Sequence, residues 1–202
     1  MLAAVFVVLL GGAALLYNKF SGEVENERLM TTDSGAEESR ENSESSEEAD
    51  GSAKKEEPVI APDFTVYDGE GNAVNLSDFV GKPVILNFWA SWCGPCQMEM
   101  PDFDEAYAAY GENIHFLMVN MTDGSQETLE TAKAFIEESG YAFPVYYDTE
   151  MDGAMTYGVT SLPCTFFINA EGHAITYATG MIDGETLELG IGMITEKKTV
   201  EE

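Results

Sequence analysis

Two cysteines stand two residues apart in the segment Trp92-Cys93-Gly94-Pro95-Cys96, directly after the apolar run Pro83 to Ala90. Such a pair can close a disulfide on itself and can open one in another protein. The attacking species is a thiolate, and a cysteine at a helix N-terminus is made more acidic by unpaired amides and the positive end of the dipole. We therefore expect Cys93 to attack, and Cys96, one turn further on the same face, to resolve the mixed disulfide.

The elements that would position this pair are a strand and a helix. The run Pro83 to Ala90 is almost continuously apolar, which is typical of a strand covered on both faces. A helix is expected from about Gly94 to Tyr110. Pro95 is compatible with its first turn, where the amide has no partner to lose, whereas Pro101 lies inside the helix and predicts a kink.

The rest of the globular region alternates strand and helix signals. Strands are expected at Phe64 to Tyr67, Val74 to Leu76, Ile114 to Asn120, Val145 to Tyr147, Cys164 to Asn169 and His173 to Ala178, and helices from Gly124-Ser125 to Glu138 with a stop at Gly140, at Asp152 to Tyr157 and at Gly184 to Ile194. This order predicts an α/β or α+β fold with a central mixed β-sheet, and we expect the α/β class, with helices flanking the sheet, an N-terminal β-hairpin and an inserted helical segment.

The chain of 202 residues divides into three regions by composition. Residues 1–20 begin with the apolar run Met1 to Tyr17, which is just long enough to span a membrane and is followed by Lys19. We expect an uncleaved signal-anchor, with a cleaved signal peptide as the alternative. Residues 21–57 hold 13 acidic and 4 basic side chains and predict a disordered linker, and residues 58–202 form the globular domain.

Negative charge dominates the whole chain. The formal net charge is −28, and from Pro58 to the C-terminus 24 Asp and Glu face 4 Lys and Arg. A nucleic-acid partner is not expected, because phosphate backbones are bound through Lys and Arg.

A structural metal site is not expected either. The chain has three cysteines and two histidines, His115 and His173, and their spacing matches no zinc pattern. The dithiol carries two electrons itself, so no cofactor is required.

The segment NFWASWCGPCQMEMP resembles the active-site segment of the thioredoxin superfamily. More closely, it is similar to the membrane-anchored TlpA/ResA-like thiol-disulfide oxidoreductases. The resemblance runs from about Val59 to Ile194 and includes the opening Ala61-Pro62-Asp63-Phe64 and the segment YGVTSLPCTFFINAEG. It implies a thioredoxin-like fold.

The resemblance also implies roles for single residues. Cys93 would be the nucleophile and Cys96 the resolving cysteine of a redox disulfide, while Trp92, Leu162 and the cis-proline Pro163 would bind substrate. Trp92 would shield the dithiol, the alternative being plain core packing.

Glu99, three residues after the second cysteine, would exchange protons with Cys96; the alternative is a solvated helix residue. Asn87 stands where thioredoxin itself has a buried aspartate, which moves the proton-handling role to Glu99. Cys164 follows Pro163 directly and is expected to be a small buried strand residue, with a third redox thiol as the sharper hypothesis.

The function expected from the resemblance is reduction of disulfides in exported proteins, with apocytochrome c as one candidate. The enzyme would be single-pass in the cytoplasmic membrane with its catalytic domain outside, re-reduced by a membrane electron donor of the CcdA/DsbD type. The alternatives are a dithiol oxidase, a peroxiredoxin-like antioxidant enzyme and a copper-chaperone-like binding module, the last because His173 follows the Asn169 to Gly172 turn.

Overall fold

Strand β5 (Val84–Trp89) lies at the centre of the computed structural model, which describes residues 30–31 and 59–195. All six of its side chains are buried, as its apolar sequence predicts. It pairs in parallel with β6 (His115–Asn120) and antiparallel with β8 (Cys164–Ile168). The residues that follow β5 therefore leave the middle of the sheet.

The described strands form one sheet with the order β1-β9-β8-β5-β6-β7-β3-β4, and β2 also pairs with β9. The remaining strands are β1 (Met30–Thr31), β2 (Val59–Ile60), β3 (Thr65–Tyr67), β4 (Ala73–Asn75), β7 (Val145–Tyr147) and β9 (His173–Thr179). The pairs β5–β6 and β6–β7 are parallel and the other pairs are antiparallel, which confirms the mixed sheet. The expected N-terminal hairpin is the antiparallel pair of β3 and β4.

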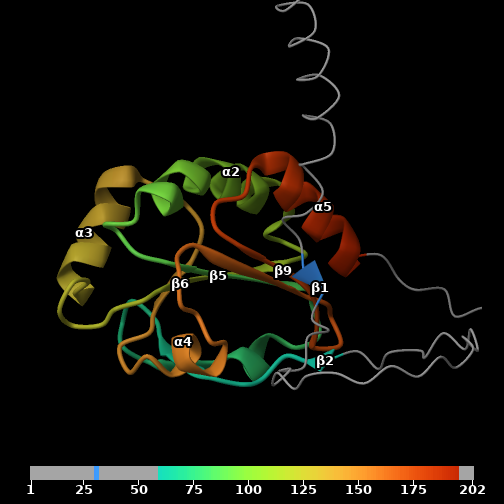
Figure 1. Ribbon diagram of the computed structural model, residues 1–202, viewed down its shortest axis with the longest axis horizontal. Helices are drawn as coiled ribbons and strands as arrows, with labels where there is room; N and C mark the ends of the chain where they lie inside the picture. Colours follow the sequence, from blue (N-terminus) through green and yellow to red (C-terminus); the bar gives the residue numbers. More distant parts are fainter. Residues whose placement is uncertain (1–29, 32–58, 196–202) are drawn as a thin grey trace, which may run out of the picture.

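Helices cover both faces of this sheet (Figure 1). Helices α2 (Gly94–Tyr110), α3 (Leu129–Ser139) and α5 (Gly184–Thr195) pack on one face, and α4 (Asp152–Thr156) and the short 3-10 helix η1 (Leu76–Phe79) on the other. Side chains alternate along each strand, so two apolar clusters form, one on each side. The α/β class and the flanking helices are confirmed, including the helical segment inserted between β6 and β7.

Helix α3 begins later than the sequence predicts. A start at Gly124-Ser125 was expected, whereas the first helical residue is Leu129. The carboxylate of Asp123 accepts hydrogen bonds from the backbone amides of residues 125–127 and so holds them in a turn. Thr128 then caps the helix through its side chain.

Strand β1 was not expected. Met30 and Thr31 belong to the segment predicted as a linker, yet they pair antiparallel with Tyr177 and Thr176 of β9. The rest of that segment, and the predicted span at residues 1–20, lie outside the described residues. Among the helices that are described, none combines the length and the apolar character needed to cross a membrane.

Helix α5 approaches the sheet closely because residue 190 has no side chain. A Cβ atom placed on Gly190 would lie 2.2 Å from Cε1 of Phe167, a fully buried ring on β8. On Gly192, two residues further along the helix, a Cβ atom would meet nothing within 4 Å.

We predict opposite effects for alanine at these two positions. Gly190→Ala should lower the free energy of unfolding by about 1–3 kcal/mol, because the buried ring cannot move aside. Gly192→Ala should raise it by about 0.5–1 kcal/mol, since alanine favours helix over glycine. Urea unfolding of both variants measures the difference, and equal effects would contradict the close packing of α5 on Phe167.

Candidate active site

The two cysteines of the motif form a disulfide at the start of α2. The Cys93–Cys96 bond joins residues whose Cα atoms are 5.3 Å apart. Cys93 is the N-cap of the helix, and its Sγ accepts a hydrogen bond from the backbone amide of Cys96 at 3.2 Å. The predicted place of the pair, between a buried strand and a helix N-terminus, is confirmed. Cys93 is 4% exposed and Cys96 fully buried, so the first sulfur is nearer the surface.

Leu162 and Pro163 directly precede β8, the strand that pairs antiparallel with β5. Their peptide bond is cis, as the family resemblance implies, and the carbonyl of Pro163 accepts a hydrogen bond from the amide of Gly180 at 2.8 Å. Leu162 packs against the apolar cluster that contains both Cys93 and Cys96. Leu162 therefore lies against the dithiol cluster from a segment distant in sequence, and Pro163 follows it directly.

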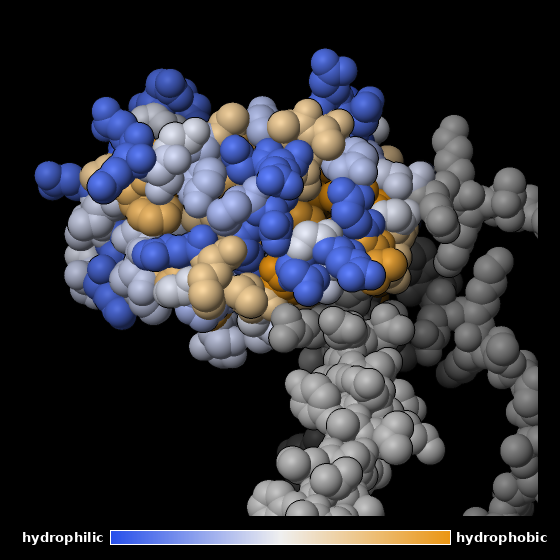
Figure 2. Space-filling model, turned by 90° about the horizontal axis from the view of Figure 1, so that it is seen from above, coloured by the Kyte–Doolittle hydropathy of each residue, from blue (hydrophilic) through white to orange (hydrophobic). Residues whose placement is uncertain are grey.

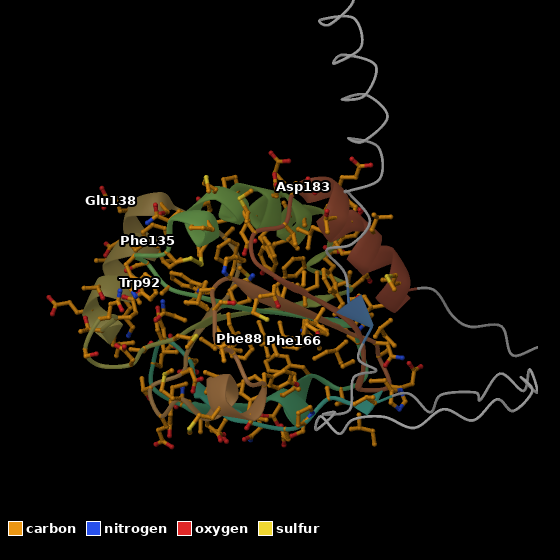
Figure 3. All side chains as sticks on the ribbon, viewed as in Figure 1. Phe88, Trp92, Phe135, Glu138, Phe166 and Asp183 are labelled. Atoms are coloured by element: carbon orange, nitrogen blue, oxygen red, sulfur yellow. A yellow bond between two sulfur atoms is a disulfide. The ribbon has the colours of Figure 1, made fainter. Side chains whose placement is uncertain are left out.

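Trp92, the third of these residues, is half exposed at 50%. Figure 3 shows it at the side of the domain where α3 lies. The alternative of plain core packing is therefore wrong for Trp92. An exposed indole beside a disulfide is available to contact another protein.

Glu99 lies one helical turn beyond Cys96 and is 1% exposed, so the alternative of a solvated helix residue is wrong. Its Oε1 accepts a hydrogen bond from Nδ2 of Asn87 at 2.8 Å, and its Oε2 accepts one from the amide of Ile182 at 3.0 Å. Burial raises the pKa of Glu99 to about 7, against the opposing effect of these two hydrogen bonds. This carboxyl group can gain or lose a proton near neutral pH without contact with bulk water.

Asn87 connects Glu99 to the sheet. It is fully buried on β5, and its Nδ2 also donates to Oγ1 of Thr165 on β8 at 2.9 Å. Its Oδ1 has no hydrogen-bond partner among the described residues. A neutral amide here orients the carboxyl group of Glu99 without adding a second charge, as the sequence comparison with thioredoxin suggested.

Cys164 lies on the other face of the sheet from the dithiol. It belongs to the apolar cluster under α4 together with Phe88 and Phe166, the latter two visible at the centre of Figure 3, whereas Cys93 and Cys96 belong to the opposite cluster. Burial raises the pKa of Cys164 to about 11. The structure thus favours the expected small buried strand residue over a third redox thiol.

The sequence did not point to Ser91 or Glu127. The carboxylate of Glu127, in the loop before α3, accepts hydrogen bonds from both the amide and the hydroxyl of Ser91. Glu127 stands among Gly, Ser and Gln, a context typical of a solvated loop, so no signal in the sequence marked it.

The face over α2, α3 and α5 carries hydrophilic side chains with hydrophobic patches between them (Figure 2). The exposed hydrophobic residues of the dithiol helix and its entrance are Trp92 and Met98. Apolar side chains beside the cysteines suit contact with another polypeptide.

Comparison with known proteins identifies similar chains. Residues 59–177 match the AhpC/TSA family. The thiol-disulfide oxidoreductase ResA of Bacillus thuringiensis subsp. konkukian is 38% identical over 136 residues, which cover 67% of this chain and 76% of that protein. ResA of Bacillus subtilis is 36% identical over 121 residues, covering 59% and 65%.

Solved structures show the same fold. The pneumococcal exposed lipoprotein thioredoxin of Streptococcus pneumoniae is 31% identical with a TM-score of 0.57, covering 65% of this chain and 99% of that one. StoA from Bacillus subtilis is 26% identical with a TM-score of 0.57, covering 66% and 99%. The thioredoxin-like fold predicted for the domain is confirmed.

The buried carboxyl group of Glu99 predicts a pH-dependent stability of the oxidised protein. Its pKa is raised from 4.5 to about 7 on folding, so the folded chain holds the proton more tightly than the unfolded chain. The stability that the folded chain gains from the protonated Glu99 is complete below pH 4.5 and is lost as the pH rises through 7. The free energy of unfolding should fall by an amount on the order of 3 kcal/mol over this range. Glu99→Gln should remove this loss, which urea unfolding at pH 5 and pH 8 measures.

The matched control is Glu105→Gln, on the exposed side of the same helix, which should keep the wild-type difference between the two pH values. Asp148 is also buried with a raised pKa, so the comparison is between variants and not with a flat profile. An unchanged slope in Glu99→Gln would show that Glu99 does not titrate in this range.

Proposed function

Because the chain belongs to the AhpC/TSA family and to the ResA-type thiol-disulfide oxidoreductases, we propose that it reduces disulfides of exported proteins outside the cytoplasmic membrane. The observation that carries this proposal is the Cys93–Cys96 disulfide at the start of α2, with the buried carboxyl group of Glu99 one turn behind it. A disulfide that is both at a helix N-terminus and backed by a proton acceptor is suited to exchange and not to bracing the fold.

Reduction proceeds in two exchanges. The thiolate of Cys93 attacks one sulfur of the substrate disulfide, forms a mixed disulfide and releases the first substrate thiolate. The thiolate of Cys96 then attacks the sulfur of Cys93, which closes the Cys93–Cys96 bond and releases the second substrate thiolate. Two electrons pass from the dithiol to the substrate, and the two thiol protons end on the substrate sulfurs.

Glu99 serves the second exchange. Cys96 is fully buried, so water has poor access to its proton. Glu99 lies on the same face of α2, and its pKa of about 7 lets it accept that proton as Cys96 attacks. Trp92, Leu162 and Pro163 contact the substrate chain on either side of the reacting sulfurs.

The reduced state is restored by a partner, since the reaction ends with the dithiol oxidised. A membrane electron donor of the CcdA/DsbD type fits a domain held near a membrane, and the apolar run at residues 1–20 is the proposed anchor, with the catalytic domain outside. Apocytochrome c, whose haem-binding cysteines must be reduced before attachment, is one candidate substrate.

The alternatives are less well supported. A dithiol oxidase would use the same residues, but the Gly-Pro dipeptide between the cysteines is the one that thioredoxin carries at the reducing end of the scale. A peroxiredoxin-like enzyme needs a reactive thiolate, and Cys164, the one cysteine outside the motif, is buried with a raised pKa.

A copper-binding module would need a histidine beside the dithiol. His173 begins β9, whereas the end of β9 nearest Pro163 is Thr179, which pairs with Cys164. Six residues of extended strand place these ends about 20 Å apart. His173 is therefore remote from Cys93.

The proposed reductase activity should depend strictly on the thiol of Cys93. Cys93→Ser should abolish reduction of insulin disulfides by the purified domain, because no thiolate remains to attack. Cys164→Ala is the control and should keep full activity, since that thiol lies on the other face of the sheet. Insulin reduction at the wild-type rate in Cys93→Ser would refute the mechanism.

Location and substrates are tested together in cells. Cys96→Ser should trap substrates as mixed disulfides on Cys93, since the resolving thiol is missing. We expect the trapped proteins to be exported proteins, recovered in the membrane fraction as mixed disulfides. We also expect protease added outside intact spheroplasts to digest the catalytic domain. Trapped cytoplasmic proteins or a protected domain would contradict the proposed location.

A further inference from the structure

The carboxylate of Glu127 is buried next to the turn that carries the dithiol. The residue is 1% exposed, although it lies in the loop between β6 and α3. Its Oε2 accepts from the amide of Ser91, and its Oε1 accepts from Oγ of Ser91 at 3.0 Å and from the hydroxyl of Thr131 on α3. Both carboxylate oxygens are thus directed to a segment two residues before Cys93.

The loop holds Glu127 in this place through its own backbone. Asp123 accepts hydrogen bonds from the amides of Ser125, Gln126 and Glu127, the last at 2.9 Å. The carbonyl of Glu127 in turn accepts from the amide of Gly124 at 2.9 Å. A residue fixed by its main chain and by three side-chain hydrogen bonds is a specific contact and not a loop residue folded inward by chance.

Ser91 transmits this contact to the active site. Its carbonyl accepts a hydrogen bond from Nε2 of Gln97, in the first turns of α2, and the amide of Cys93 donates to the carbonyl of Ala90 at 3.2 Å. Ser91 is therefore held from one side by Glu127 and from the other by Gln97 of α2, and Cys93 is hydrogen-bonded to the residue before Ser91.

Hydrogen bonds, and not a cation, hold this carboxylate. Within residues 59–195 the basic side chains are Lys82 and Lys133. Their Nζ atoms donate to the carbonyls of Glu112 and Gly69, respectively. Within the described residues, the hydrogen-bond partners of the Glu127 carboxylate are Ser91 and Thr131, both neutral, so its negative charge can act on neighbouring groups such as Cys93.

We propose that Glu127 is a positioning residue that holds the turn before Cys93 through Ser91, and that its charge disfavours the Cys93 thiolate. A like charge nearby opposes ionisation, against the favourable effect of the helix N-terminus. A less stable thiolate makes the reduced state less stable, so the dithiol becomes a stronger reductant. The inference rests on the proposed function only for the direction of electron flow.

Each Glu127 variant is compared with a parent chain in which all other ionisable groups are the same. Cys96 and Glu99 lie on α2, Asp123 and Glu130 belong to the loop and the first turn of α3, and Cys164 lies on the far face of β8. A difference between Glu127 variants therefore reports the charge of Glu127.

The test measures how alkylation of Cys93 by iodoacetamide depends on pH. In a Cys96→Ser, Cys164→Ala background, Cys93 is the sole thiol of the chain. Glu127→Gln keeps hydrogen bonds to Ser91 and Thr131, whose hydroxyls can reverse their roles, and removes the charge. We expect the midpoint of the pH profile to fall by about 0.5–1 pH unit.

A second readout uses the chain with Cys96 present. In Glu127→Gln, the equilibrium with glutathione should shift about 3- to 10-fold toward the reduced dithiol, which is up to about 30 mV. A purely structural role for the hydrogen bonds would change stability and leave this equilibrium unmoved.

Two control variants complete the test. Glu130→Gln removes an equal charge from an exposed position three residues away and should leave the midpoint unchanged. Glu127→Asp keeps the charge with a shorter side chain and should keep the wild-type midpoint. If Glu127→Gln does not fold, Glu127→Asn replaces it, since it differs from Glu127→Asp in charge alone and its midpoint should fall.

An unchanged midpoint in Glu127→Gln, or a fall in Glu127→Asp, would overturn the inference. Neither measurement uses a protein substrate. Failure of the proposed function would instead appear as insulin reduction that does not need Cys93.

Discussion

A carboxyl group held out of water at the centre of the domain constrains the structure around it. Glu99 tolerates burial because two donors, from Asn87 on β5 and from the amide of Ile182 before α5, meet its two oxygens. These contacts tie the central strand, the dithiol helix and the entry to the last helix to a single group. The arrangement of α2 and α5 over the sheet therefore serves the fold and the proton chemistry together.

Because successive side chains of a strand face opposite sides of the sheet, the active-site residues lie on one face and residues with a packing role lie on the other. On β5 and β8, Asn87 and Thr165 face the dithiol cluster and hydrogen-bond to each other, while their neighbours Phe88 and Cys164 face the opposite cluster. A shift of one residue along β8 therefore separates Thr165, which belongs to the hydrogen-bond network of Glu99, from the buried thiol of Cys164. Adjacency to Pro163 along the chain did not bring Cys164 to the dithiol, because successive side chains on a strand point to opposite faces.

Strong local signals made much of this site predictable from sequence. The apolar run before the motif indicated β5, and the motif itself indicated the start of α2. Gly140 ends α3 as predicted, and its φ of 72° is left-handed. The start of α3 was wrong because a side chain, Asp123, competes for the backbone amides of the first turn. A hydrogen bond from a backbone amide to a side chain cannot be predicted from the spacing of apolar residues.

Polar contacts between residues distant in sequence were harder to predict from the sequence. The hydrogen bonds that Ser91 donates to Glu127 join residues 36 positions apart, and nothing in the composition of either segment indicates the other. The burial of Glu99 could be anticipated only through its resemblance to a known pattern, since a glutamate on a helix is usually solvated. Polar residues reveal their partners only when the fold brings distant segments together.

The pairing of β1 with β9 shortens the stretch of chain between the apolar run and the sheet. If the apolar run ending at Tyr17 is held in a membrane, a domain attached first at Val59 could move up to about 150 Å away, by the length of an extended chain. Attachment at Met30 reduces that limit to about 45 Å. The edge of β9, which carries both β1 and β2, would then determine how far from the membrane surface a disulfide can lie and still be reached.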